Sequence, residues 1–96
     1  MVVGKVVGNA ESSVRVSGLE GRKLMVVQRL SAQGKPAGEY LLATDYIGAG
    51  VGQYVAMVTG SVASRLEGSR DVPTDTSIVA IIDHLYVNDK EMLPKE

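Results

Sequence analysis

The sequence predicts an all-β fold, a small and mostly antiparallel β-barrel with one short helix. Valine outnumbers leucine fifteen to eight, and β-branched side chains favour a pleated, half-buried surface. Eleven glycines separate short apolar stretches, which is typical of strands joined by tight turns. The length of 96 residues fits one domain, and we expect it to span residues 1–96.

Three strands are predicted in the first half of the chain. The first covers residues 2–8 and can extend through 14–16. The second covers 23–31, where apolar residues alternate between two faces. Residues 34–38 then form a hairpin-length loop, because the proline within them lacks the N–H donor that a strand ladder needs. The third strand covers 39–44.

Two further strands and a helix are predicted in the second half. Residues 53–59 form a strand, a serine then caps a short helix over 61–66, and the polar residues 67–77 form a loop. The last strand covers 78–87. Its apolar first half requires cover on both faces, as in a barrel wall or at a subunit contact. Strands in this order resemble an OB-type Greek-key barrel.

The size of the chain indicates that it associates with other copies of itself. A domain of this length buries only about 60–65% of its unfolded surface, and its single core supplies roughly 3–5 kcal/mol. Such domains are usually reinforced by a disulfide, a metal or oligomerisation. Cysteine is absent and His84 is the single histidine, so we expect no disulfide, no metal and no cofactor. Oligomerisation is the reinforcement that is left.

The charge pattern argues against nucleic acid and membranes as partners. Ten Lys and Arg residues are scattered among eleven Asp and Glu residues, and the longest basic run is Arg22-Lys23. No basic stripe is therefore available for a phosphate backbone. No apolar run approaches the roughly 20 residues of a membrane helix, and the first five residues lack the basic-then-apolar order of a signal peptide. We expect a cytoplasmic protein.

No residue pattern indicates catalysis. The glycines of residues 48–52 precede a β-type segment rather than a helix, so they lack the context of a nucleotide-binding loop. Asp83 and His84 are neighbours on a strand and point to opposite faces, which prevents them from acting together in a catalytic triad. Asp71 and Asp75 lie in a polar loop without an apolar pocket to raise a carboxyl pKa. We predict that the protein is not an enzyme.

An OB-type single-stranded nucleic-acid-binding module is the alternative function that such a barrel suggests. These modules stack bases on aromatic side chains within a basic groove. The aromatic residues here are four tyrosines that do not interleave with Lys or Arg clusters: Tyr40, Tyr46, Tyr54 and Tyr86. Packing in the core or at an interface is the simpler interpretation of them.

Several segments, taken in order and spacing, resemble a known family. They read GKVVG at 4–8, LMVVQ at 24–28, ATDYIGAG at 43–50, GSVA at 60–63, and PTD followed by IVAIID within 73–83. Each segment is short, but together they cover the chain from about residue 3 to residue 83. In this register they resemble the EutN/CcmL family, the pentameric vertex proteins of bacterial microcompartment shells (carboxysomes and metabolosomes).

The resemblance implies a structural tile rather than an enzyme. Members of the family form a small OB-like barrel, and five subunits join head to tail into a truncated pyramid. The expected partners are four further copies in a homopentamer and the hexameric or pseudohexameric proteins of the shell. The expected location is the microcompartment shell in the cytoplasm. A closed ring of identical contacts agrees with the need for oligomerisation that follows from the small core.

The resemblance also implies candidate residues for the subunit interface or the opening on the ring axis. They lie on four turns: Asp45, Gly48, Ala49 and Gly50; Gly60 and Ser61; Pro73 and Asp75; and Asp83. We expect residues 45–50 to pack with their backbone close to a subunit contact, and Asp45 to accept hydrogen bonds from loop N–H groups. The family places Arg directly after its G-S-x-A turn, whereas here Ser64 fills that position and Arg65 follows. On a helix this shift rotates the guanidinium by about 100°.

Overall fold

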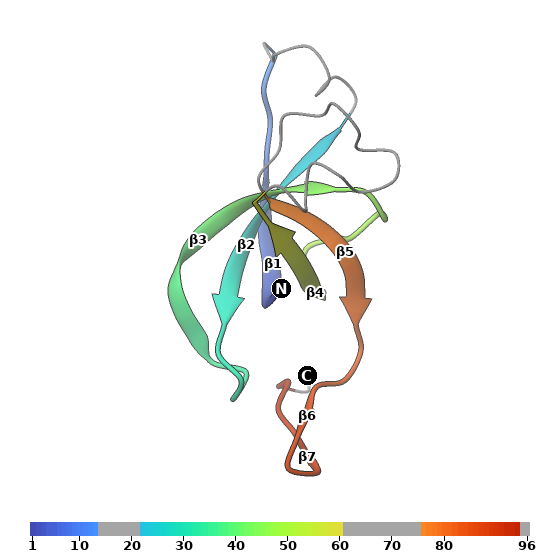
Figure 1. The fold of residues 1–96 in the computed structure, drawn as a ribbon. Coiled ribbons are helices and arrows are strands. Elements are labelled where there is room, and N and C mark those ends of the chain that lie inside the picture. The colour runs from blue at the N-terminus through green and yellow to red at the C-terminus, as the bar shows by residue number, and fades with distance from the viewer. Residues whose placement is uncertain (14–21, 61–75, 95–96) are drawn as a thin grey trace.

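The computed structural model of the protein describes residues 1–13, 22–60 and 76–94. Within them five strands close into a barrel in the order β1-β2-β3-β5-β4, and β4 pairs with β1 (Figure 1). The strands are β1 (Val2–Ala10), β2 (Lys23–Leu30), β3 (Pro36–Asp45), β4 (Tyr54–Thr59) and β5 (Thr76–Ile82). Neighbours are antiparallel except β3 and β5, which are parallel. This arrangement confirms the predicted barrel.

Parts of three expected elements fall outside the residues that the structure describes. They are the helix over 61–66, the extension of the first strand through 14–16, and most of the loop over 67–77. The described residues contain no helix, and therefore none that is long and apolar enough to cross a membrane.

The loop predicted over residues 34–38 is shorter than expected, because β3 already begins at Pro36. The turn is closed by the N–H of Ser31, which donates to the Lys35 carbonyl at 2.8 Å, and by the N–H of Gly34, which donates to the Ser31 carbonyl at 2.9 Å. A proline is tolerated at the first residue of a strand, where its missing donor disrupts the ladder least. The prediction treated Pro36 as a strand breaker, although at this position it starts the strand.

The single strand predicted over residues 78–87 is in fact two elements. β5 ends at Ile82, and a small hairpin of β6 (Tyr86–Val87) and β7 (Lys90–Glu91) follows it. Asn88 and Asp89 close this hairpin with φ of 52° and 65°. A two-residue turn with both central residues at positive φ matches the twist of paired strands, and Asn and Asp tolerate it better than most residues.

The core lies inside the barrel and is made of aliphatic and methionine side chains. Its fully or nearly fully buried members come from all five strands and the β3–β4 loop: Val6, Met25, Val27, Ala43, Ala49, Val55, Met57 and Ile78. A Cβ added to Gly4 would collide with the Val27 side chain and lie 2.9 Å from the Gln28 carbonyl oxygen. Glycine at this position lets β1 approach β2 closely.

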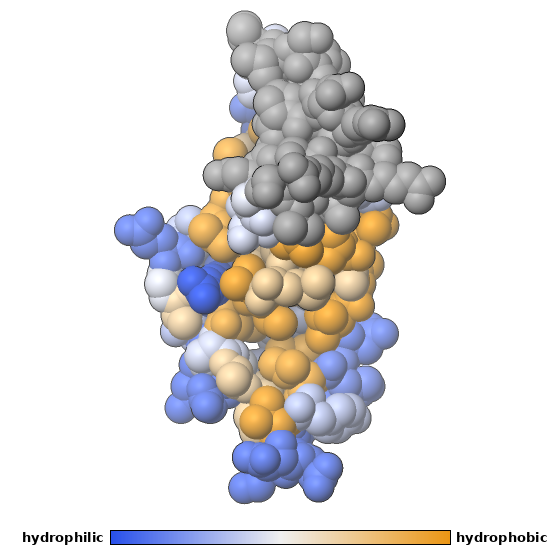
Figure 2. Space-filling view, viewed as in Figure 1, coloured by the Kyte–Doolittle hydropathy of each residue, from blue (hydrophilic) through white to orange (hydrophobic). Residues whose placement is uncertain are grey.

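The barrel closes only briefly between β3 and β5. Their pairing is limited to Thr44 with Ser77 and Asp45 with Ile78, and beyond these residues the two strands arch apart (Figure 1). Hydrophobic residues gather over the middle of this side of the molecule (Figure 2). Ile81 on β5 is 37% exposed, so the apolar run of β5 is not covered on both faces within one chain.

Candidate subunit interface

The loop between β3 and β4 starts from a buried carboxylate. Asp45 is the last residue of β3 and is only 7% exposed. Its Oδ1 atom accepts a hydrogen bond of 3.0 Å from the N–H of Ile47. A carboxylate that binds the backbone two residues ahead forms an Asx turn, which directs the chain sharply away from the strand. Asp45 therefore sets the direction in which the glycine-rich loop leaves the barrel.

The same loop is fastened along β1 by backbone hydrogen bonds. The N–H of Gly52 donates to the Val6 carbonyl at 2.8 Å, and the N–H of Val6 donates to the Gln53 carbonyl at 2.9 Å. A further hydrogen bond lies within the loop, where the N–H of Gly50 donates to Oε1 of Gln53 at 2.7 Å. These contacts hold residues 50–53 against the barrel wall and leave the Val51 side chain exposed.

The residues predicted on this loop have different environments. Gly48 has a φ of +82°, whereas Gly50 lies outside the left-handed region. A Cβ on Gly48 would meet nothing within 4 Å, and one on Gly50 would only touch Oε1 of Gln53 at 3.8 Å. Ala49 is fully buried in the core of its own chain. Its candidacy as an interface residue is therefore corrected: Ala49 anchors the loop and offers no surface to a neighbour.

The remaining candidates are distributed over both ends of β5. Gly60 follows β4, whose last residue Thr59 pairs with Thr76 at the start of β5, and it has a φ of +70°. Asp45 pairs near the same end, with Ile78. Asp83 is exposed and follows the other end of β5. The structure therefore brings Asp45 and Gly60 to one end of β5 and leaves Asp83 apart. Ser61, Pro73 and Asp75 lie outside the described residues.

Buried polar atoms accompany Asp45 at this end of the barrel. Among the described residues, Oδ2 of Asp45, the Tyr46 hydroxyl and Oγ of Ser77 are buried without a hydrogen-bond partner. The Arg22 guanidinium lies over the Tyr46 ring, 4.8 Å from its centroid, a distance at which the cation and the ring attract each other. No interface role was predicted for Ser77, which directly precedes the apolar run of β5.

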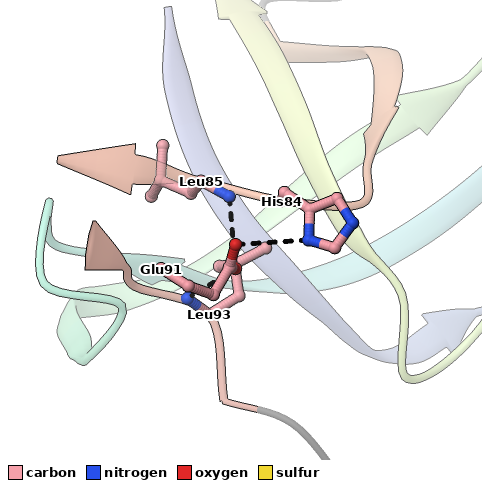
Figure 3. Close-up of polar contacts among 4 residues, drawn as sticks. All are labelled: His84, Leu85, Glu91 and Leu93. Atoms are coloured by element: carbon pink, nitrogen blue, oxygen red, sulfur yellow. Dashed lines mark hydrogen bonds and ion pairs between the residues drawn. The ribbon is translucent and has the colours of Figure 1, made fainter. Parts of the chain in front are cut away.

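A second polar cluster lies on the C-terminal hairpin and centres on Glu91 (Figure 3). Oε1 of Glu91 accepts hydrogen bonds from the N–H groups of Leu85, at 3.3 Å, and Leu93, at 3.2 Å. Oε2 lies 3.2 Å from Nδ1 of His84, whose ring stacks on Tyr86 with 5.7 Å between centroids. One carboxylate thus holds both ends of the hairpin together. No signal in the polar C-terminal sequence indicated this role.

The chemistry of this cluster is structural. Partial burial raises the pKa of Glu91, but the Leu85 and Leu93 N–H donors and the nearby His84 ring outweigh it and hold the pKa below its ordinary value. A carboxylate engaged in this way is ionised and already satisfied. Within the residues that the structure describes, no group of three or more acidic or histidine side chains could hold a metal ion.

The family described as "Ethanolamine utilisation protein EutN/carboxysome" matches residues 1–83. The chain is 36% identical to the bacterial microcompartment shell vertex protein EutN of Salmonella typhimurium, over 99% of this chain and 96% of that protein. It is 38% identical to the carboxysome shell vertex protein CcmL of Synechocystis, over 91% of this chain and 87% of that protein.

Solved structures agree with the sequence relatives. CcmL of Gloeobacter violaceus superimposes with a TM-score of 0.91 at 32% identity, covering 99% of this chain and 98% of that one. GrpN of Rhodospirillum rubrum, described as a pentameric microcompartment shell protein, superimposes with a TM-score of 0.81 at 34% identity, covering 91% and 98%. These relatives favour a structural shell protein over an enzyme or a nucleic-acid-binding module. The predicted family is confirmed: the chain belongs to the EutN/CcmL family of shell vertex proteins.

Proposed function

We propose that five copies of this chain form a closed ring that occupies the vertices of a bacterial microcompartment shell in the cytoplasm. The observation that carries this proposal is the near end-to-end match to shell vertex proteins, together with the pentameric description of GrpN at 34% identity. Because the match leaves little of either chain uncovered, we take residues 1–96 as one vertex domain. The role is structural and needs no cofactor.

The physical properties of the chain support a ring rather than a lone subunit. A 96-residue domain without cysteine has a small core and no covalent reinforcement. Large apolar side chains, among them Leu42 and Val51, are exposed on the isolated chain. Contacts between two different surfaces generate a ring when the rotation closes and a filament when it does not. A ring of five buries such surfaces on every copy.

We assign the candidate residues of the sequence, except Ala49, to the subunit contact or the axial opening. Gly48 and Gly60 support this assignment, because each has a positive φ and open space where a side chain would stand. A neighbouring backbone can approach closely at such positions. The proposal extends to Asp45, Gly50 and Asp83, and to Ser61, Pro73 and Asp75, which lie outside the described residues.

The further partners that we propose are the hexameric or pseudohexameric proteins that tile the facets of a shell. Hexagonal tiles alone pave a plane, so a closed shell needs pentagonal units at its corners. The charge pattern, with ten basic and eleven acidic residues scattered singly, gives no basic surface for nucleic acid. We therefore propose neither nucleic acid nor a membrane as a partner.

Co-expression with the hexameric proteins of one microcompartment tests this function. We expect closed polyhedral particles that contain the chain, and open sheets or tubes when the chain is omitted. Particles that close equally well without the chain, or that exclude it, would contradict the proposal. The alternative is tested by titrating the chain into a labelled single-stranded oligonucleotide at low ionic strength, where any phosphate-driven binding is strongest. We expect no binding.

A further inference from the structure

We propose that the neighbouring subunit of the ring packs on the outer face of β1, β2 and β3. This inference rests on the pentamer proposed above and identifies one of the two surfaces that build it. We call this surface the three-strand face and define it by the outward residues Val7, Val26, Gln28, Tyr40 and Leu42.

The strand register places these side chains side by side. Val27 and Leu41 belong to or pack against the core, so the residues that alternate with them along β2 and β3 point outward. Across the sheet, Val26 pairs with Leu42. Directly paired side chains on one face of a sheet are in contact with each other.

A bulge in β1 adds Val7 to this apolar row. The register shifts between Val6 and Gly8, and Gly8 is the residue opposite Val26. A bulge inserts an extra residue and re-aims its side chain. Val7 is accordingly 42% exposed and lines the same groove as Tyr40.

The composition of the face is unusual for the outside of a barrel. The outer faces of antiparallel sheets are normally polar, but Leu42 is 53% exposed and Tyr40 is 66% exposed. The centres of protein–protein interfaces are depleted in charge and enriched in tyrosine. The five defining residues of the three-strand face are uncharged, and the charged residue beside them is Lys5, which pairs with Gln28 and whose ammonium lies 5.6 Å from the centroid of the Tyr54 ring.

The face is also shaped to receive a partner. Val7, Gln28 and Tyr40 line a groove of about 360 Å³, to which Lys5 also contributes. The groove continues to Tyr54 on β4 and to Pro36 at the start of β3. Gln28, on the face itself, uses its Nε2 atom to donate to the Arg29 carbonyl at 3.0 Å and to the Gly38 carbonyl at 3.4 Å. Its amide is therefore engaged within the chain, and the groove presents mainly apolar and aromatic surface.

The face is adjacent to the glycine-rich loop. That loop is bonded to β1 through Gly52 and Val6, and Val51, 64% exposed, lies on it directly before Gly52. A neighbour seated on the three-strand face is therefore in reach of the loop that the family resemblance assigned to the contact. We commit to a second copy as the occupant, because relatives of the same fold are described as pentameric shell proteins.

Charge introduced on the face tests the inference. Leu42→Lys and Val7→Lys each place an ammonium at an exposed position, so the subunit keeps its fold, as far-UV circular dichroism will check. Native mass spectrometry at a concentration where the wild type is pentameric should show the pentamer fraction reduced at least tenfold in each. Tyr86→Lys is the matched control: this hairpin residue is 64% exposed, and its variant should remain pentameric.

The outcomes separate this inference from the proposed function. Wild-type pentamers together with pentameric Leu42→Lys and Val7→Lys variants would overturn the assigned face and leave the ring intact. If the Tyr86→Lys control also dissociates, the assigned face is overturned too, because an added charge would then disrupt the pentamer wherever it is placed. A wild type that never forms pentamers would overturn the proposed function, and this inference with it.

A labelling experiment covers the case in which the lysine variants fail to fold. The chain has no cysteine, so a single thiol is a clean reporter. In the pentamer, the thiol of the Leu42→Cys variant should react with a maleimide at least tenfold more slowly than that of the Tyr86→Cys variant. In concentrated urea the two should react alike. Equal rates in the native pentamer would overturn the inference.

Discussion

The backbone of Gly34 packs directly against the carbonyl group of Met92. A Cβ on Gly34 would collide with the Met92 carbonyl oxygen and lie 3.0 Å from its carbon. The turn between β2 and β3 therefore holds the C-terminal segment backbone to backbone, and Leu93, the next residue, is buried there. Glycine is required at this position for space as well as for its φ of +76°.

Substitution of Gly34 should cost more stability than substitution of a glycine with the same backbone conformation. Gly38 has a φ of +80°, and a Cβ there would meet nothing within 4 Å. Gly38→Ala should lower the free energy of unfolding by about 1–2 kcal/mol, the cost of left-handed backbone. Gly34→Ala should lower it by about 2–5 kcal/mol, because overpacking adds about 1–3 kcal/mol. Urea unfolding at one fixed protein concentration measures both, and equal losses would contradict the contact.

A second pair of glycines tests how β1 packs. A Cβ on Gly4 would collide with the Val27 side chain and lie 3.0 Å from Cε of Met57, whereas one on Gly8 would lie 3.8 Å from the Val26 Cβ, an ordinary contact. Gly4→Ala should lower the free energy of unfolding by about 1–3 kcal/mol. Gly8→Ala should change it by no more than about 0.5 kcal/mol. If Gly4→Ala is as stable as the wild type, β1 does not approach β2 as closely as described.

The carboxylate of Glu91 should make the C-terminal hairpin sensitive to acid. The pKa of Glu91 in the folded protein lies below its ordinary value of 4.5, so folding favours the ionised form. The contribution of ionised Glu91 to folding stability is therefore complete above about pH 4.5, and it is lost as the pH falls through the lower pKa that Glu91 has in the folded protein. Hydrogen exchange of the Leu85 and Leu93 amides, corrected for intrinsic rates, should show protection that declines in acid.

Glu91→Gln should remove most of this protection already at neutral pH, because a neutral amide oxygen is a weaker acceptor than a carboxylate. Glu39→Gln, at an exposed position on β3, is the matched control and should exchange like the wild type. Unchanged protection of both amides in Glu91→Gln would show that the carboxylate does not hold the hairpin.

The glycine-rich loop offers a separate test of the subunit contact. Gly50 lies outside the left-handed region and has room for a side chain within its own chain. Gly50→Val should therefore fold as a subunit and lose pentamers only if a neighbour packs there, which we expect. Gly48→Val is also strained in the free subunit, because Gly48 has a φ of +82°. Native mass spectrometry reads the assembly, and wild-type pentamer levels in both variants would place the loop outside the contact.

Much of the barrel could be predicted from the sequence, because alternation reports which side of a strand is buried. In the strand predicted over 23–31, the alternation puts Met25 and Val27 on the same face, and both are buried. The strand ends were predicted less well, because they depend on local φ values. Pro36 starts β3 instead of breaking it, and Asn88 and Asp89 close a hairpin where one long strand was expected.

The candidate site was harder to predict, because its contacts join residues far apart in the sequence. Asp45 was expected to bind loop N–H groups, and it accepts one from Ile47. The hydrogen bonds that join the backbone of Val6 to Gly52 and Gln53 depend on strand pairing that no local pattern shows. The three-strand face likewise becomes visible only when the register places Val26 beside Leu42. The pentameric ring was expected from the family resemblance, whereas the three-strand face, which we propose as its contact, follows from the strand register.

Native mass spectrometry of the purified wild-type chain at micromolar concentration measures the central claim most directly. We predict that the main species has five times the 10.2 kDa mass of the chain, with no series of larger open assemblies. A monomer or a dimer as the main species under these conditions would contradict the account.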